Sequence, residues 1–397
     1  MPWRRRPFRS SSLARALNIS HLRDIASRRV PNFVFEYVEG GSEDEASLRC
    51  NRSAFEAYRL VPQTLVDTSG RHQRTSLFGR EMKSPLAIAP TGMNGILYPE
   101  GDIALARAAA AAGIPFCLST VSTTRLEEVA AKAGGRLWMQ LYVMRNRAVA
   151  ENIISRAHAA GFEALVFTTD ANVFGHREWD RRNYTRPGRP TLRNVLDMVR
   201  HPVWLRDVML RNGVPSFVNF ADFLPPGGAS AIGGSTIIPT LFGPTLTWDD
   251  ITWLRGIWDR KLLIKGVLNT ADAERAAGLG CDGIVLTNHG GRQLDSCVAP
   301  VDMVAEIAAA VGKRMAVIVD SGFRRGTDVV KALALGADAV MVGRATLYGL
   351  AAGGEAGANR ALEILTTEID RVLGQLGVCC VEDLGPQFIR HTGSVAA

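Results

Sequence analysis

The stretch Thr287-Asn288-His289-Gly290-Gly291-Arg292-Gln293-Leu294-Asp295 directly follows the apolar run Gly283-Ile284-Val285-Leu286. That run predicts a buried strand, so the carboxyl end of the strand would carry a histidine, two glycines and an arginine to one place. Glycines let the backbone approach a ligand closely, His289 can exchange a proton near neutral pH, and the planar guanidinium of Arg292 can bind a carboxylate. This combination favours a site that removes a proton from a small acid over an ordinary turn with a surface histidine.

Eight apolar runs of this kind alternate with helical patterns along the chain. Strands are expected at 85–90, 115–119, 136–142, 164–170, 262–266, 283–288, 316–322 and 339–344, and helices at 100–112, 124–133 and 146–160 separate the first four. Eight parallel strands joined by helices close into a (β/α)8 TIM barrel, here at about residues 84–376. A doubly wound open α/β sheet is the alternative, but the G-x-G-x-x-G signature of its first turn is absent.

Three segments are expected outside the barrel strands and helices. Residues 1–18 are basic and contain serines, which predicts a flexible tail ahead of a single domain at 19–397. Residues 20–58 carry helical patterns, and residues 171–246 form a long insertion after the fourth strand, rich in Arg, Trp, Pro and Gly. An insertion of this length is usually functional. Two interpretations of it stay open, namely a flap on a membrane surface or a lid on the barrel mouth.

The composition is that of a globular, cytoplasmic protein. Of 397 residues, 47% are hydrophobic and 21% are charged, and there is no run of 18 apolar residues that would predict a membrane-spanning helix. The basic N-terminus lacks the apolar core of a secretory signal. Six cysteines without a C-x-x-C pair indicate reduced thiols and no metal site. The net charge of +7 suits an anionic substrate or membrane surface, whereas interspersed acidic residues argue against nucleic-acid binding.

Polar residues occupy the carboxyl ends of the expected strands, where barrel enzymes place their active sites. The set comprises Thr91, Ser119, Gln140, Tyr142, Thr168, Asp170, Lys265, Thr287, His289, Asp320 and Arg344. A full circle of polar strand ends is hard to explain by structure alone. Glycines and arginines in the stretch Asp320-Ser321-Gly322-Phe323-Arg324-Arg325-Gly326 and in Gly343-Arg344 predict a phosphate site beside strands seven and eight.

Three of the candidate residues have two interpretations each. Lys265 could form a Schiff base with a carbonyl compound, or its charge could stabilise a reduced, anionic cofactor ring. Asp170 could orient His289 and stabilise its protonated form, or it could cap a helix. Composition alone favours a packing role for Tyr37 over a phenol directed into a site.

The motifs at 287–295 and 320–326 resemble the FMN-dependent L-2-hydroxy acid dehydrogenases and oxidases, and the resemblance extends from about residue 20 to 390. The stretches 90–95 and 343–350 are most similar to the mandelate dehydrogenase branch of that family. The family usually has serine at the position of Thr287, and the threonine retains the hydroxyl group of that serine.

The resemblance implies a role for each matching residue. His289 would be the base, with Asp170 as its partner, and Lys265 would stabilise reduced FMN. Substrate contacts would come from Arg292, Arg177, Tyr37 and Tyr142. For Tyr37, this implied contact replaces the packing interpretation. FMN would be held by Pro90, Thr91, Gly92, Ser119, Gln140, Thr168, Lys265, Thr287, Asp320, Gly322, Arg324, Gly343 and Arg344.

The implied function is oxidation of an (S)-2-hydroxy acid to the 2-oxo acid, with electrons passed to a quinone or another membrane acceptor. Gly92 and Val121 stand where glycolate oxidases have alanine and tryptophan, which favours a larger, mandelate-like substrate. A glycine at position 92 is also more typical of the electron-transferring dehydrogenases than of the oxygen-using oxidases. A membrane contact through residues 171–246 on the cytoplasmic face and a homo-tetramer are further expectations from the resemblance.

Other functions stay open at this point. Within the family, the chain could be an L-lactate dehydrogenase, an oxidase that reduces oxygen, or an enzyme that oxidatively modifies a peptide-derived redox cofactor. Outside it, aldolase-type chemistry at Lys265 or non-catalytic binding of a phosphate ligand or nucleic acid would fit parts of the sequence. The combination of His289, Asp170 and Lys265 argues against simple binding, because binding needs no base.

Overall fold

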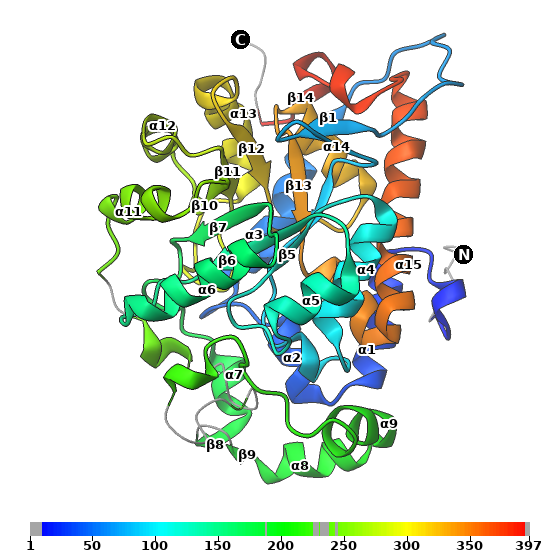
Figure 1. The fold of residues 1–397 in the computed structure, drawn as a ribbon. Helices are drawn as coiled ribbons and strands as arrows, with labels where there is room; N and C mark the ends of the chain where they lie inside the picture. The colour runs from blue at the N-terminus through cyan, green and yellow to red at the C-terminus, as the bar shows by residue number, and fades with distance from the viewer. Residues whose placement is uncertain (1–9, 187–188, 225–229, 231–237, 243–244, 394–397) are drawn as a thin grey trace, which may run out of the picture.

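The computed structural model describes residues 10–186, 189–224, 230, 238–242 and 245–393. Its centre is a closed barrel of eight strands, each pair of neighbours parallel, in the order β10-β11-β12-β13-β4-β5-β6-β7 (Figure 1). This confirms the predicted TIM barrel and each of its eight strands. The strands are β4 (Leu86–Ile88), β5 (Phe116–Leu118), β6 (Leu137–Leu141), β7 (Ala164–Thr168), β10 (Lys261–Val267), β11 (Gly283–Leu286), β12 (Ala316–Val319) and β13 (Ala339–Val342).

Both faces of the barrel wall are buried, which explains why its strands are continuously apolar rather than alternating. Trp138, Val166, Ile318 and Met341 belong to a cluster that fills the interior. The opposite faces of the strands pack against the surrounding helices in a second, larger cluster. Those helices are α4 (Gly101–Ala112), α5 (Leu126–Ala133), α6 (Arg147–Ala159), α11 (Asp249–Ile257), α12 (Thr270–Gly278), α13 (Pro300–Val311), α14 (Gly326–Ala334) and α15 (Arg344–Leu376).

Side-chain caps and glycines set several of the helix ends. Asn146 and Asn269 accept hydrogen bonds from backbone amides in the first turns of α6 and α12, as asparagine commonly does at helix N-termini. Helix α15 is broken by non-helical backbone at Gly353 and Gly354, so it packs as two segments against α1 and α4.

The N-terminal region packs beside the barrel as η1 (Leu13–Arg15), α1 (Ile19–Arg29), α2 (Asn32–Glu39), α3 (Ala46–Ser53) and η2 (Ala54–Ala57). The flexible tail predicted for residues 1–18 covers two parts. Residues 1–9 lie outside the described residues. Ser10 and Ala16 are buried, and their carbonyls accept hydrogen bonds from Arg28 and Arg360, so this part of the segment is packed against the domain. The sequence did not reveal these contacts because they join the segment to side chains that lie 18 and 344 residues further along the chain.

Two small antiparallel sheets of short strands lie outside the barrel. β1 (Tyr58–Leu60) pairs antiparallel with β14 (Ile389–His391), and β2 (Thr75–Leu77) pairs with β3 (Arg80–Met82). Two 3-10 turns, η7 (Val381–Asp383) and η8 (Pro386–Phe388), lead into β14, and η3 (Asn94–Ile96) follows β4. The pair β1–β14 therefore joins the segment that follows the N-terminal helices to the C-terminal end of the described chain.

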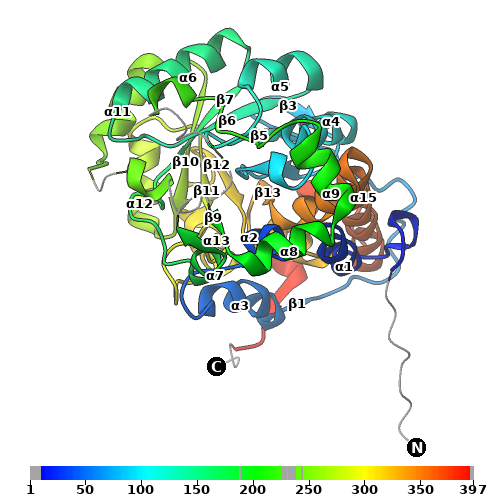
Figure 2. The ribbon, with the colours of Figure 1, turned by 90° about the horizontal axis from the view of Figure 1, so that it is seen from below.

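The insertion after β7 forms a layer of short elements over one end of the molecule, next to α1 and α2 (Figures 1 and 2). They are α7 (Glu178–Arg182), β8 (Tyr184–Arg186), β9 (Arg189–Pro190), α8 (Leu192–Val199), α9 (Pro202–Trp204), the π-helix η4 (Leu205–Leu210), η5 (Ala221–Phe223) and η6 (Ile238–Leu241). None of the helices in the described parts of the chain is both long and apolar enough to cross a membrane.

Helix α8 buries polar side chains and exposes apolar ones, which is the opposite of an ordinary surface helix. Its polar residues Asn194 and Asp197 are buried, whereas Leu192, Leu196 and Val199 are exposed by 74%, 58% and 65%. The buried side chains are satisfied, because Asn194 donates to Asn183 and Asp197 accepts from the amide of Asn32. An apolar face directed outward marks an interaction surface.

Candidate active site

His289 lies three residues beyond β11, in a turn of left-handed backbone. Its φ is +58°, and Gly290 and Gly291 follow with +67° and +76°. The His289 amide donates to Thr287 Oγ1 at 2.9 Å, and the Gly290 amide donates to Ser321 Oγ at 3.0 Å. Non-glycine residues held at positive φ are costly and cluster at functional sites. The turn thus holds the imidazole in a fixed place at the barrel mouth.

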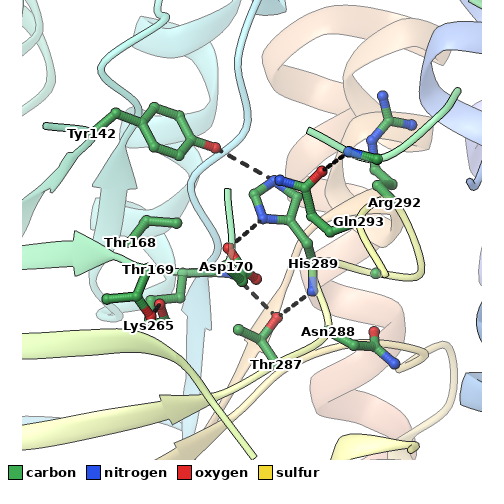
Figure 3. A network of polar contacts seen from close by, with 12 residues as sticks. Tyr142, Thr168, Thr169, Asp170, Lys265, Thr287, Asn288, His289, Arg292 and Gln293 are labelled. Carbon is green, nitrogen blue, oxygen red and sulfur yellow. Dashed lines mark hydrogen bonds and ion pairs between the residues drawn. The ribbon is translucent and has the colours of Figure 1, made fainter. Parts of the chain in front are cut away.

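The imidazole of His289 lies between a carboxylate and a phenol (Figure 3). Its Nδ1 is 2.9 Å from Asp170 Oδ1, and its Nε2 is 3.4 Å from the hydroxyl of Tyr142. An ionised Asp170 accepts from Nδ1–H, which leaves Nε2 able to take a proton. This contact favours the orienting role of Asp170 over the helix cap.

The charge states of the pair suit a base. Burial lowers the pKa of His289 below its usual value, against the opposing effect of Asp170, so the imidazole is neutral near pH 7. Burial acts to raise the pKa of Asp170, but His289 and then Lys265 outweigh it and hold that pKa below the ordinary range. A neutral imidazole next to an ionised carboxylate can accept a proton and keep it.

Arg292 and Arg177 lie at the same cavity and face each other. Arg292 Nη1 donates to the carbonyls of Tyr37 and Gly40, both at 2.7 Å, and Arg177 Nε donates to the Arg292 carbonyl at 3.1 Å. Burial and the neighbouring Arg292 lower the pKa of Arg177 to about 10, so the Arg177 guanidinium stays charged at neutral pH. Two clustered, partly buried cations form an anion site.

Tyr37 and Tyr142 line the cavity as neutral phenols. The Tyr37 hydroxyl donates to the Gly92 carbonyl at 3.2 Å, and its ring lies beneath the Arg292 guanidinium. Burial raises the pKa of both tyrosines. Tyr37 therefore lines the cavity and also packs against the hydrophobic core, so the packing interpretation and the site interpretation both describe part of its environment.

Lys265 at the end of β10 is a buried cation. Its Nζ lies 3.1 Å from Asp320 Oδ2 and donates to Thr287 Oγ1 at 3.1 Å. Burial acts to lower the pKa of Lys265, but Asp320 and Asp170 outweigh it and raise that pKa. A Schiff base requires a neutral amine, so this pairing favours the role of a fixed positive charge.

A row of polar side chains continues behind the cavity wall. Ser119 donates to Gln140 Oε1 at 3.1 Å, and Gln140 Nε2 donates to Thr168 Oγ1 at 3.0 Å. Gln140, Thr168, Thr287 and Asp170 are not part of the lining itself but lie one layer deeper, where they position the residues in front of them.

The other end of the cavity is rich in glycine and arginine. Gly322, Arg324, Gly343 and Arg344 line it, together with Pro90, Thr91 and Ser321. Arg344 donates to the carbonyls of Val38, Gly40 and Gly290, so much of its guanidinium is occupied by backbone. Arg324 stacks on the Tyr348 ring.

Gly92 gives less room than its small size predicts. A Cβ at position 92 would overlap Val121 Cγ2, because the Val121 side chain fills the space beside the glycine. The extra room for a substrate therefore comes from Val121, which is smaller than the tryptophan of glycolate oxidases at this position. Gly92 itself adds no room.

Residues 26–391 match the family described as FMN-dependent dehydrogenase. The chain belongs to this family. It is 43% identical to (S)-mandelate dehydrogenase of Pseudomonas putida over 95% of this chain and 94% of the relative. It is 42% identical to a putative L-lactate dehydrogenase of Mycobacterium tuberculosis (97% and 92%) and 37% identical to an L-lactate oxidase of a Nostoc species (96% and 99%). A crystal structure of the monotopic membrane protein (S)-mandelate dehydrogenase superposes with a TM-score of 0.90 at 42% identity, over 95% of this chain and all of that one.

The cavity of this FMN-dependent dehydrogenase fits the cofactor of its family. Ser119 and the charged Lys265 line the cavity and would face the edge of a flavin ring, while Gln140 and Thr168 support Ser119 from behind. Gly322 and Gly343 line the cavity beside Arg324 and Arg344, and such a set of glycines and arginines could hold a phosphate. Membership of the family also removes aldolase chemistry and non-catalytic binding from consideration.

Several lining residues escaped the sequence analysis. Phe174 from the insertion, Val38 and Leu347 form apolar parts of the wall, and Phe242 packs on Tyr142 with ring centroids 5.1 Å apart. Asp180 lies buried near Arg292. Phe174 and Phe242 carried no signal beyond their place in a long insertion, but Asp180 follows Arg177 by three residues, which is one helical turn.

Proposed function

We propose that this FMN-dependent dehydrogenase oxidises an (S)-2-hydroxy acid with an aromatic side chain, such as mandelate, to the 2-oxo acid. The observation that carries the proposal is the meeting of the His289–Asp170 pair with Arg177 and Arg292 at one cavity. The relatives named after mandelate and lactate support a 2-hydroxy acid, and the aromatic wall of Phe174, Tyr37 and Tyr142 supports an aromatic side chain.

The side chains divide the chemistry between them. Arg177 and Arg292 bind the substrate carboxylate, and the phenols of Tyr37 and Tyr142 bind its hydroxyl group. His289 Nε2 accepts a proton from the carbinol group, and Asp170 stabilises the resulting imidazolium. FMN, when bound, would accept the two electrons and the remaining proton that the substrate loses. Lys265 supplies the positive charge that favours a reduced, anionic flavin.

The test is anaerobic reduction of the purified protein, followed by the visible flavin spectrum. Rapid bleaching by (S)-mandelate and slow bleaching by L-lactate are expected. Faster bleaching by lactate would make the protein an L-lactate dehydrogenase, in line with several relatives. A flavin that neither acid bleaches would overturn the proposal. Comparing oxygen with a quinone as the oxidant of the reduced protein then separates an oxidase from the proposed dehydrogenase.

We further propose that the protein binds the cytoplasmic face of a membrane through the insertion, where a quinone could accept the electrons. The support is the outward apolar face of α8, formed by Leu192, Val195, Leu196 and Val199, with Arg193 and Arg200 exposed beside it. Basic and apolar residues on one exposed helix suit an anionic lipid surface. The structure of a relative described as a monotopic membrane protein agrees with this proposal.

Co-sedimentation with vesicles that contain anionic phospholipid tests the membrane contact. Leu196→Glu and Val199→Glu are expected to release the protein, whereas Leu17→Glu, at an exposed apolar residue outside the insertion, is not. Equal binding of all variants would contradict the contact.

We propose a homo-tetramer as the assembly, which sedimentation velocity measures directly. Loss of self-association in the α8 variants would instead assign the helix to a subunit interface.

A further inference from the structure

Asp180 is a buried carboxylate whose Oδ2 atom lacks a hydrogen-bond donor among the described residues. It lies on α7 in the insertion, is only 5% exposed, and its Oδ2 forms no hydrogen bond within the described parts of the chain. Its nearest cationic atom is Arg292 Nη2 at 3.8 Å, which is an ion contact rather than a hydrogen bond. A buried carboxylate normally has hydrogen bonds or a close partner, so this arrangement needs an explanation.

The arginines in front of Asp180 keep part of their hydrogen-bonding capacity. Arg292 uses Nη1 for two carbonyls, and Arg177 uses Nε for a carbonyl and Nη2 for a long contact of 3.4 Å with Gln293. Arg292 Nη2 and Arg177 Nη1 form no hydrogen bond to any described residue. Asp180 therefore neutralises part of the charge of the pair without occupying the donors that a ligand would use.

Electrostatic effects couple the three side chains, and burial acts against the charged form of Asp180. Burial raises the pKa of Asp180, and Arg292 and Arg177 act against that rise. Asp180 in turn opposes the lowering of the Arg177 pKa by burial and by Arg292. The other acids near the imidazole have close polar partners, because Asp170 contacts His289 at 2.9 Å and Asp320 contacts Lys265 at 3.1 Å.

We infer that Asp180 is a resident counter-ion of the Arg177–Arg292 pair, which limits how tightly the cavity holds a carboxylate. The inference rests on the proposed function, in which these arginines bind the carboxylate of the substrate. Substrate and product both carry that carboxylate, so an arginine pair without a counter-ion would retain the 2-oxo acid. Asp180 repels both anions and lets the product leave.

The test compares two ligands of the same shape that cannot be oxidised, phenylacetate and its neutral amide. Their dissociation constants are measured from changes in the flavin spectrum of the holoenzyme. In Asp180→Asn and Asp180→Ala, phenylacetate is expected to bind about tenfold more tightly, because a neighbouring negative charge is gone. Binding of the amide is expected to change by less than about twofold, since it carries no charge.

Two further variants serve as controls. Asp180→Glu keeps the charge and is expected to retain the wild-type ratio of the two constants. Asp197→Asn removes another buried carboxylate of the insertion, which accepts a hydrogen bond from the Asn32 amide and lies 3.9 Å from His201, and this variant is also expected to retain the wild-type ratio. A purely structural role of Asp180 would weaken the binding of both ligands, which is opposite to the expected gain for the anion.

The remaining outcomes overturn the inference. Weaker or unchanged binding of phenylacetate in the neutral variants would do so, as would a wild-type protein that does not prefer the carboxylate to the amide. Loss of flavin in both neutral variants, with flavin kept in Asp180→Glu and Asp197→Asn, would assign Asp180 to folding instead. These measurements need no turnover, so they stand apart from the bleaching test, whose failure would remove the proposed reaction.

Discussion

At the scale of single residues, function depends on charges that are held in pairs. Asp170 serves His289, Asp320 serves Lys265, and each pair lies within 3.1 Å. In a buried site such contacts fix both the position and the protonation state of the reacting group. The residue scale is therefore where changes in pH dependence are expected.

Asp170→Asn is expected to lower kcat/KM by about 10²–10⁴-fold, because the imidazolium loses its stabilising charge. The sign of the accompanying pH effect follows from the contact. Asp170 acts to raise the pKa of His289, so its removal lowers that pKa further. The acid limb of the kcat/KM profile should thus move to lower pH, as steady-state rates between pH 4 and 8 would measure. A limb that moves to higher pH would contradict the pairing.

Gly92→Ala tests the contact with Val121. The new methyl group would overlap Val121 Cγ2, and overpacking of this kind costs about 1–3 kcal/mol. A lower thermal midpoint and weaker retention of FMN are expected, and the double variant Gly92→Ala with Val121→Ala should recover both. Gly70→Ala is the matched control, because a methyl group there meets nothing within 4 Å. Equal midpoints for all of these variants would refute the steric argument.

At the scale of elements, the end of β10 shows how local backbone shape positions a side chain. The register of β10 against β11 shifts between Lys265 and Val267, and Gly266 between them has a φ of +120°. Its Cα approaches β7 so closely that a Cβ would lie 2.7 Å from Thr169 Oγ1 and 2.9 Å from the Asp170 amide. A bulge beside an active site commonly redirects a side chain, and this one lies directly against Asp170, which we expect it to hold toward His289.

Gly266→Ala is expected to lower kcat/KM by about 10²-fold, because displacement of Asp170 by even about 1 Å breaks the alignment with His289. The flavin spectrum should persist, since the cofactor end of the cavity is not touched. Gly278→Ala on α12 is the control, as a methyl group there meets nothing. Wild-type turnover in Gly266→Ala would show that the bulge does not position Asp170.

The elements also show how far sequence reasoning reaches. All eight barrel strands were predictable, because strands buried on both faces are continuously apolar. The strand ends then placed His289, Arg292, Lys265 and Asp320 around one mouth, since parallel strands end on one side. Roles for these residues remain predictions until variants are measured. Two features were out of reach, namely the pair β1–β14 and the position of Asp180 behind Arg292, because each depends on contacts between distant segments.

At the scale of the whole molecule, β1 and β14 fasten the N-terminal helices to the end of the chain. Ile389 on β14 is buried, and truncation of such a residue to alanine costs about 2–5 kcal/mol. Ile389→Ala is therefore expected to lower the thermal midpoint, with the rate of flavin reduction unchanged below it. Leu17→Ala, at an exposed residue, should leave the midpoint unchanged. Calorimetry of the two variants measures the difference, and equal midpoints would show that β14 is dispensable for stability.

Closure of the barrel has a consequence for biosynthesis. β4 ends at Ile88 but needs β13, which begins at Ala339, as one of its two neighbours. A ribosome adds about 5–20 residues per second, so β4 waits roughly 10–50 s for this partner. During that time the apolar edge of the nascent chain is uncovered and open to aggregation. We therefore expect chaperones to shield the growing polypeptide until nearly all of it has been translated.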